Sequence, residues 1–267
     1  MTVATSRTNP IKVVIHLIIY RLEISGSIYS WRGAAWIITA ASIFSLVAYL
    51  LLTDKELSLL DQGEMLFTFS EVIIVLGLVM SGINSSSSIS TEIEAGTFEC
   101  LLLTPIKHVQ IAIQKMLSTV TIWIVLYLIS IPYLIVLANG TNLAISAILY
   151  VGLYGTLLSI AISTISIALS WMLKTSKNSI MVALMIVLLL SAPSLFFATS
   201  LRKTDFGIML ENINPFSHTI NSLDSVLVDN QQAVYEQFTH IWPVLVFTII
   251  CSIIFLTFTR KFEVKML

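Results

Sequence analysis

Three acidic residues and a short run of leucines form a compact segment between two long apolar stretches. Glu92, Glu94 and Glu99 precede the leucines at 101–103, and Thr104-Pro105 follows them. The residue before a proline avoids the α region, so a helix is expected to end there. A continuous helix would place Glu92 and Glu99, seven residues apart, near one face. Carboxylates beside a leucine knob suit docking onto another protein, although an ordinary amphipathic loop helix at the lipid headgroups fits the same pattern.

Glu71 is the one acid well inside an apolar run. A charge at the middle of a bilayer costs roughly 3 kcal/mol on insertion scales, so such a residue usually faces a cavity or a partner. Glu71 is expected about one turn from the outer end of its span. It therefore either lines a substrate path or reaches the interface.

Catalytic and metal-binding patterns do not emerge from the sequence. His218, His240 and the neighbouring acids lack the tight spacing of metal ligands, so no metal site is expected. No Ser-His-Asp or Cys-His arrangement stands out. The phosphate-binding pattern G-x-x-x-x-G-K-[ST] does not occur. We therefore expect neither an enzyme nor an ATP site in this chain, and no cofactor of its own.

Composition points to an all-α integral membrane protein. Apolar residues make up 57% of the chain and charged residues 11%, and the mean hydropathy is +0.93. Soluble domains carry about 25% charged residues. The net charge of −1 gives no field that would attract nucleic acid.

Six apolar runs approach or exceed the roughly 20 residues that a transmembrane helix needs. They are approximately Ala34–Leu52, Leu66–Ile83, Ile113–Leu137, Ala144–Leu173, Ser179–Ala198 and Ile241–Phe258. Pro132 and Pro193 are expected to kink or break the third and fifth runs near their ends. The fourth run has a face of small residues that predicts close helix packing or, alternatively, a polar translocation lining: Gly152, Gly155, Ser159, Ser163, Ser166 and Ser170.

The distribution of basic residues predicts the orientation, because Lys and Arg concentrate in cytoplasmic loops. An even number of spans with both termini in the cytoplasm leaves only Lys55, Arg202 and Lys203 outside. The other eleven of the fourteen basic residues then lie inside: Arg7, Lys12, Arg21, Arg32, Lys107, Lys115, Lys174, Lys177, Arg260, Lys261 and Lys265. We therefore expect a multi-pass protein of the cell (inner or plasma) membrane.

Two further segments complete the expected organisation. Residues 1–33 are expected to form a cytoplasmic tail and an amphipathic interfacial helix over Ile11–Ile24, although a ragged start to the first span is the alternative. Residues 34–267 then form the six-span transmembrane domain. Within it, an outer segment at about 199–240 is too long for a simple connector and predicts short helices that partly re-enter the membrane.

The acidic segment reads E-x-E-x-G-T-x-E-x-L-L-x-T-P, followed by Lys115, and it resembles the signature of the ABC transporter type-2 permease family. Ile93 and Gln114 depart from that pattern. The resemblance covers nearly the whole chain and implies a cytoplasmic coupling helix at about 91–104, between spans two and three. The ATPase-coupling residues that it implies are Glu92, Glu94, Gly96, Thr97, Glu99, Leu101, Leu102, Thr104 and Pro105.

The resemblance also implies partners and a path. A separate ABC ATPase subunit would bind ATP and Mg, and a second permease copy, identical or related, would complete an exporter. Spans two and five line the path in that family, which points here to Glu71, Ser81, Asn84 and Ser191. An ion-gradient-driven transporter or channel, an intramembrane enzyme and a non-transporting scaffold are the alternatives. The first would need several buried ionisable residues, and the second a catalytic constellation.

Overall fold

The computed structural model describes residues 20–21, 23–53, 61–99, 103, 108–139, 141–195, 204–229 and 234–265. Within these ranges the fold is helical, without a β-strand. Six of the helices are long and apolar enough to cross a membrane, which confirms the expected six spans: α2 (Trp31–Thr53), α3 (Gln62–Glu94), α5 (His108–Leu137), α6 (Leu143–Leu173), α7 (Ser176–Leu195) and α11 (Val234–Lys265).

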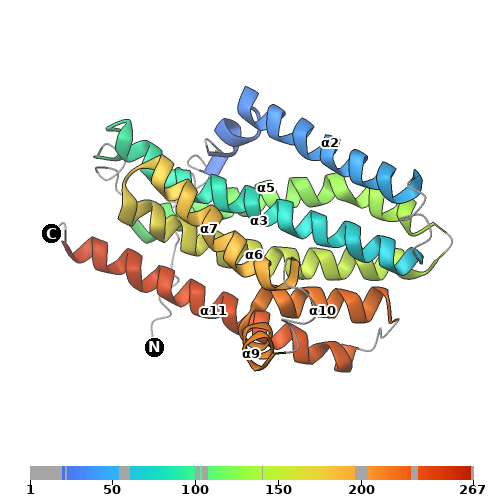
Figure 1. Ribbon diagram of the computed structural model, residues 1–267. Coiled ribbons are helices and arrows are strands. Elements are labelled where there is room, and N and C mark those ends of the chain that lie inside the picture. The colour runs from blue at the N-terminus through green and yellow to red at the C-terminus, as the bar shows by residue number, and fades with distance from the viewer. Residues whose placement is uncertain are drawn as a thin grey trace, which may run out of the picture.

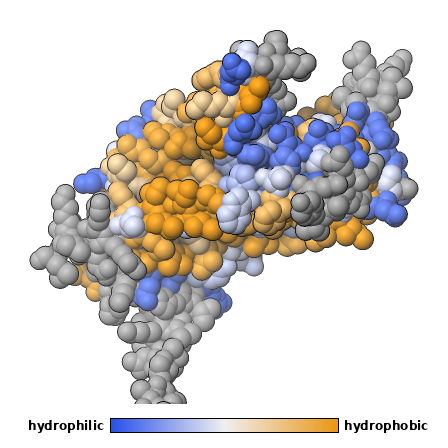
Figure 2. Space-filling view, turned by 90° about the horizontal axis from the view of Figure 1, so that it is seen from below, coloured by the Kyte–Doolittle hydropathy of each residue, from blue (hydrophilic) through white to orange (hydrophobic). Residues whose placement is uncertain are grey.

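The six long helices run side by side in alternating directions (Figure 1). The start of α2 and the end of α11 therefore lie at the end of the bundle where α3 leads to α5, called here the connector end. The opposite, far end carries two shorter helices, α9 and α10. Figure 2 shows a broad apolar surface over the bundle, with hydrophilic residues gathered toward one end. Such a surface suits a lipid environment.

Helix α3 extends well beyond its predicted end at Ile83, because it continues through a serine run to Glu94. The serine hydroxyls donate to carbonyls three or four residues back, as Ser90 Oγ does to Ser86 O at 3.0 Å. This bonding satisfies polar groups within the helix. The connector end of α3 is thus a polar, largely buried helix.

Neither proline breaks its helix, so of the expected kink or break only the kink stays a prediction. Pro132 lies inside α5, which continues to Leu137, and Pro193 lies inside α7, which continues to Leu195. Prolines are tolerated in transmembrane helices because neighbouring groups compensate for the lost hydrogen bond.

Helix α6 occupies the centre of the bundle and contacts α3, α5, α7, α10 and α11. Its small-residue face permits this close approach. A Cβ atom added to Gly155 would lie 2.0 Å from the ring of Trp123 on α5, and one added to Gly77 on α3 would do the same. Ser159 and Ser163 of α6 are fully buried. The small residues therefore serve helix packing, with Trp123 held between two glycines.

The outer segment folds into α9 (Asp205–Ile213) and α10 (Pro215–Leu227). Asn214 starts α10, because its side chain accepts a hydrogen bond from Phe216 N at 3.0 Å. Phe216 and Leu223 are fully buried, and α10 contacts α3, α6, α7 and α11. Helix α10 therefore packs into the bundle, whereas α9 buries only Gly207 and leaves Phe206 and Met209 exposed.

A buried polar chain joins this far end to the central helix. The hydroxyl of Tyr154 on α6 lies 2.7 Å from Ser222 Oγ on α10, and Ser222 donates to Gln237 of α11 at 2.6 Å. Because each member has a partner, the network can stabilise one arrangement of the three helices.

The predicted interfacial helix over Ile11–Ile24 lies mostly outside the described residues. Its last part is described: residues 23–27 are helical, and the Tyr20 hydroxyl lies 2.7 Å from Thr121 Oγ1 of α5. Residues 20–27, called here the N-terminal segment, therefore pack against α5 before α2 begins.

Candidate functional site

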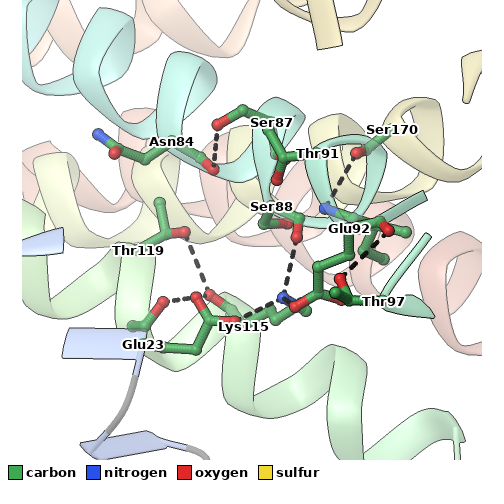
Figure 3. A network of polar contacts seen from close by, with 12 residues as sticks. Glu23, Asn84, Ser87, Ser88, Thr91, Glu92, Thr97, Lys115, Thr119 and Ser170 are labelled. Carbon is green, nitrogen blue, oxygen red and sulfur yellow. Dashed lines mark hydrogen bonds and ion pairs between the residues drawn. The ribbon is translucent and has the colours of Figure 1, made fainter. Parts of the chain in front are cut away.

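Lys115 of α5 joins three elements at the connector end (Figure 3). Its side chain is only 1% exposed. The ammonium group donates to Glu92 Oε1 of α3 at 2.8 Å and to Glu23 Oε1 of the N-terminal segment at 2.5 Å. The third donor reaches Ser88 O at 2.9 Å. Every hydrogen of the buried ammonium therefore has an acceptor.

This triad of Glu23, Glu92 and Lys115 is costly to disrupt. A buried ammonium is stable only when it is paired and hydrogen-bonded. The two carboxylates are 23% and 25% exposed, so they form the rim of the site and the lysine its base. Two acids and one base leave the triad with one net negative charge. The acidic motif predicts Glu92 on a docking surface, whereas one of its carboxylate oxygens bonds Lys115 within the bundle.

Helix α3 stops sharply two residues after Glu92. Gly96 has a φ of +69°, which glycine adopts without strain. Gly96 N donates to Ile93 O at 3.2 Å and Thr97 N to Glu92 O at 3.0 Å, the two bonds of a Schellman motif. The expected continuous helix from Glu92 to Glu99 is therefore wrong, and these two acids do not share a helix face. Gly96 and Thr97 terminate α3.

Glu94, the last residue of α3, reaches the start of α7. Its carboxylate accepts from Ser176 N at 2.9 Å and from the Ser176 hydroxyl. A carboxylate at a helix N-terminus is favourable because the first N–H groups of the helix lack partners. The end of α3 is thus attached to α7 as well as to α5 and the N-terminal segment.

The remaining residues of the motif lie beyond the turn at Gly96. Glu99 is exposed, and Leu103 is 86% exposed. The predicted coupling residues Leu101, Leu102, Thr104 and Pro105 lie outside the part of the chain that the structure describes. The exposed carboxylate and the exposed leucine are the described residues of this segment available to another protein.

A polar cavity of about 470 Å³ opens beside the triad, between α3, α5, α7 and the N-terminal segment. Its lining includes Glu23, Ser27, Trp36, Asn84, Ser87, Ser88, Thr91, Glu92, Ser118, Thr119 and Ser176. Lys115 is not part of this lining. The lining is completed by Gly26, Ile83, Ile122 and Ile180, so its hydroxyl groups, one amide and two carboxylates lie among apolar side chains.

Of the four residues predicted on a substrate path, one lines this cavity. Asn84 does so, and it also lines a small apolar pocket between α2, α3 and α5. Ser81 of α3 and Ser191 of α7 are buried and line neither space. Glu71 also lines neither; it lies nine residues after Gln62, the first residue of α3, and its place near the outer interface stays a prediction.

The structure brings together two histidines that the sequence analysis set aside. Nδ1 of His218 on α10 lies 3.4 Å from Nδ1 of His240 on α11, and Nε2 of His218 lies 3.0 Å from Asn212 O. A carbonyl only accepts, so His218 donates from Nε2. In the described part of the chain no group of three potential metal ligands accompanies the pair. Only the packing of α10 on α11 creates this contact.

The similarity of this chain to known proteins extends over most of its length. No curated protein matches it. The model of the family described as ABC-2 family transporter protein matches residues 17–262, which include the N-terminal segment, the triad and all six spans. This match confirms the resemblance seen in the acidic motif, and the chain belongs to the ABC-2 transporter family.

Proposed function

We propose that this chain is the membrane-spanning permease subunit of an ATP-driven ABC exporter. A separate ATPase subunit binds ATP and Mg, and a second permease copy completes the transporter. Family membership supports the permease role. The observation that carries the energy coupling is the attachment of the α3 end to three other elements. Glu92 bonds Lys115, which also holds Glu23, and Glu94 bonds Ser176.

These attachments give a route for mechanical work. In this proposal the ATPase docks on the segment after Gly96, through Glu99 and the leucines at 101–103. A push there moves the end of α3, because the Schellman turn fixes the segment to it. Lys115 and Ser176 then carry the displacement into α5 and α7, two walls of the polar cavity. A movement of these walls relative to each other opens or closes the cavity.

The orientation is part of the same proposal. The connector end faces the cytoplasm, since the predicted inside segments hold eleven of the fourteen basic residues. An ATPase that uses cytoplasmic ATP then meets the segment after Gly96 directly. The far end, with α9 and α10, faces outward.

Co-purification tests the proposal. The tagged chain is extracted from its native membrane in mild detergent, and vanadate-sensitive ATP hydrolysis is measured in the purified fraction. We expect hydrolysis with the wild-type chain and at least a tenfold loss in Glu99→Lys, which reverses an exposed charge on the docking segment. Asp205→Lys, a matched reversal at an exposed far-end position, is expected to retain the activity. The proposal fails if no hydrolysis co-purifies, or if the two variants behave alike.

A further inference from the structure

The lining of the polar cavity presents hydrogen-bond acceptors far more than donors. Seven lining residues carry a hydroxyl group, and six of these hydroxyls already donate to a backbone carbonyl or a carboxylate: Ser87, Ser88, Thr91, Ser118, Thr119 and Ser176. A hydroxyl has one hydrogen to donate and two lone pairs. The lone pairs are therefore what these six residues can offer to a molecule in the cavity.

Few donors remain among the described residues of the lining. Asn84 Nδ2 donates to Met80 O at 2.9 Å, which leaves its carbonyl oxygen and one N–H. Ser27 contributes the seventh hydroxyl, and Trp36 contributes an indole N–H together with an aromatic ring. Aromatic rings attract cations. The lining is thus poorly suited to bind a molecule that mainly accepts hydrogen bonds.

Within the described part of the chain, the charged groups of the lining are both acidic. Glu23 and Glu92 line the cavity, whereas Lys115 lies behind them and is 1% exposed. A molecule in the cavity therefore meets the carboxylates of a triad whose net charge is negative. Glu92 Oε2 is buried and has no hydrogen-bond partner among the residues that the structure describes. Because this oxygen is closed off, the two carboxylates act on a molecule in the cavity through their charge and through the exposed quarter of each side chain.

We propose that this cavity binds a cationic, donor-rich group, an organic ammonium or guanidinium, and disfavours anions. A cavity of about 470 Å³ falls within the roughly 300–1,000 Å³ of small-molecule sites. That the bound molecule is cargo rests on the proposed permease function. The binding itself follows from the lining alone.

Charge-selective labelling tests the sign of the cavity. A single cysteine is introduced as Asn84→Cys in a Cys100→Ser/Cys251→Ser background and reacted in detergent micelles with an aminoethyl (cationic) or a sulfonatoethyl (anionic) methanethiosulfonate. Asn178→Cys, the same substitution at an exposed position of α7, supplies the reference ratio. We expect the cationic reagent to be favoured at position 84 by at least about tenfold over that reference, given one net charge nearby. Equal ratios, or preference for the anion, would overturn the proposal.

Charge variants make the prediction quantitative. Glu92→Gln brings the net charge of the triad to zero and is expected to bring the ratio near the reference. Glu23→Gln added to it leaves Lys115 unbalanced, so the anionic reagent should then react faster. Lys115→Met leaves two carboxylates and should raise the cationic preference. Variants are compared only where size-exclusion profiles match the parent, and a ratio that ignores this series of charges contradicts the inference.

Protection by ligands tests binding without any charge variant. Asn84→Cys is reacted with neutral methyl methanethiosulfonate in the presence of agmatine, sodium succinate or glycerol at equal concentration. We expect agmatine alone to slow the reaction several-fold. Equal protection by glycerol would assign the cavity to neutral polyols, and protection by succinate to anions; either rejects the proposal, as does no protection by agmatine. If agmatine protects a protein with which no ATPase co-purifies, this inference is upheld and the permease proposal is refuted. If an ATPase co-purifies but labelling at position 84 shows no charge selectivity, the permease proposal is upheld and this inference is refuted.

Discussion

Replacing Lys115 by methionine removes the central cation of the triad while keeping a side chain of similar length. The loss leaves Glu23 and Glu92 facing each other without their counter-ion. Breaking a buried pair by removing one partner costs about 3–5 kcal/mol. The carboxylates are 23% and 25% exposed, so partial hydration places the expected loss at the lower end of that range, about 3 kcal/mol.

The measurement is thermal unfolding of the purified chain in lipid nanodiscs, followed by intrinsic fluorescence. At about 2–4 °C per kcal/mol for a chain of this size, Lys115→Met should lower Tm by roughly 6–12 °C. Lys177→Met, at an exposed position in the first turn of α7, is the matched control and should stay within about 2 °C.

A compensating variant separates electrostatics from packing. Lys115→Met combined with Glu23→Gln and Glu92→Gln removes the unbalanced charges, and buried ion pairs can be exchanged for neutral groups at little cost. Most of the lost stability should therefore return. The reasoning about this triad is refuted if the triple variant has the same Tm as Lys115→Met. It is also refuted if the Tm of Lys115→Met equals that of the Lys177→Met control.

Two further substitutions probe the packing of the bundle. Gly77→Ala should destabilise the protein by about 1–3 kcal/mol, because the new Cβ would lie 2.0 Å from the buried ring of Trp123. Gly82→Ala on the same helix is the control and should be neutral or stabilising, because its Cβ meets the nearest atom at 3.5 Å; equal unfolding temperatures of the two variants would contradict this. Tyr154→Phe should cost about 1–2 kcal/mol by chemical denaturation, because it removes a buried 2.7 Å hydrogen bond to Ser222, and an unchanged midpoint would show that this bond contributes nothing.

The number and order of the spans could be predicted because hydropathy is a local property. Twenty apolar residues have few alternatives to a membrane helix. The small-residue face of α6 could be predicted as well, since spacings of three and four place residues such as Gly155 and Ser159 on one side of a helix. The end of α3 could have been predicted, because a glycine such as Gly96 commonly follows the last turn of a helix, yet a continuous helix was expected.

The interior of the site depends on contacts between distant parts of the chain. Lys115 and Glu23 are 92 residues apart, and only the packing of the N-terminal segment on α5 brings them together. The contact between Glu94 and Ser176 spans 82 residues in the same way. The distribution of Lys and Arg placed Lys115 in a cytoplasmic segment and carried no sign that its side chain is buried.

The central claim is that a partner ATPase acts through the segment after α3 on the polar cavity. The most direct measurement is the rate at which Asn84→Cys, in the background without native cysteines, reacts with a neutral thiol reagent in the complex with its co-purified ATPase. We predict that trapping with ATP and vanadate changes this rate several-fold, and that Gly96→Pro, which cannot adopt the φ of +69°, abolishes the change while ATP hydrolysis continues. An unchanged rate in a complex that hydrolyses ATP would contradict the account.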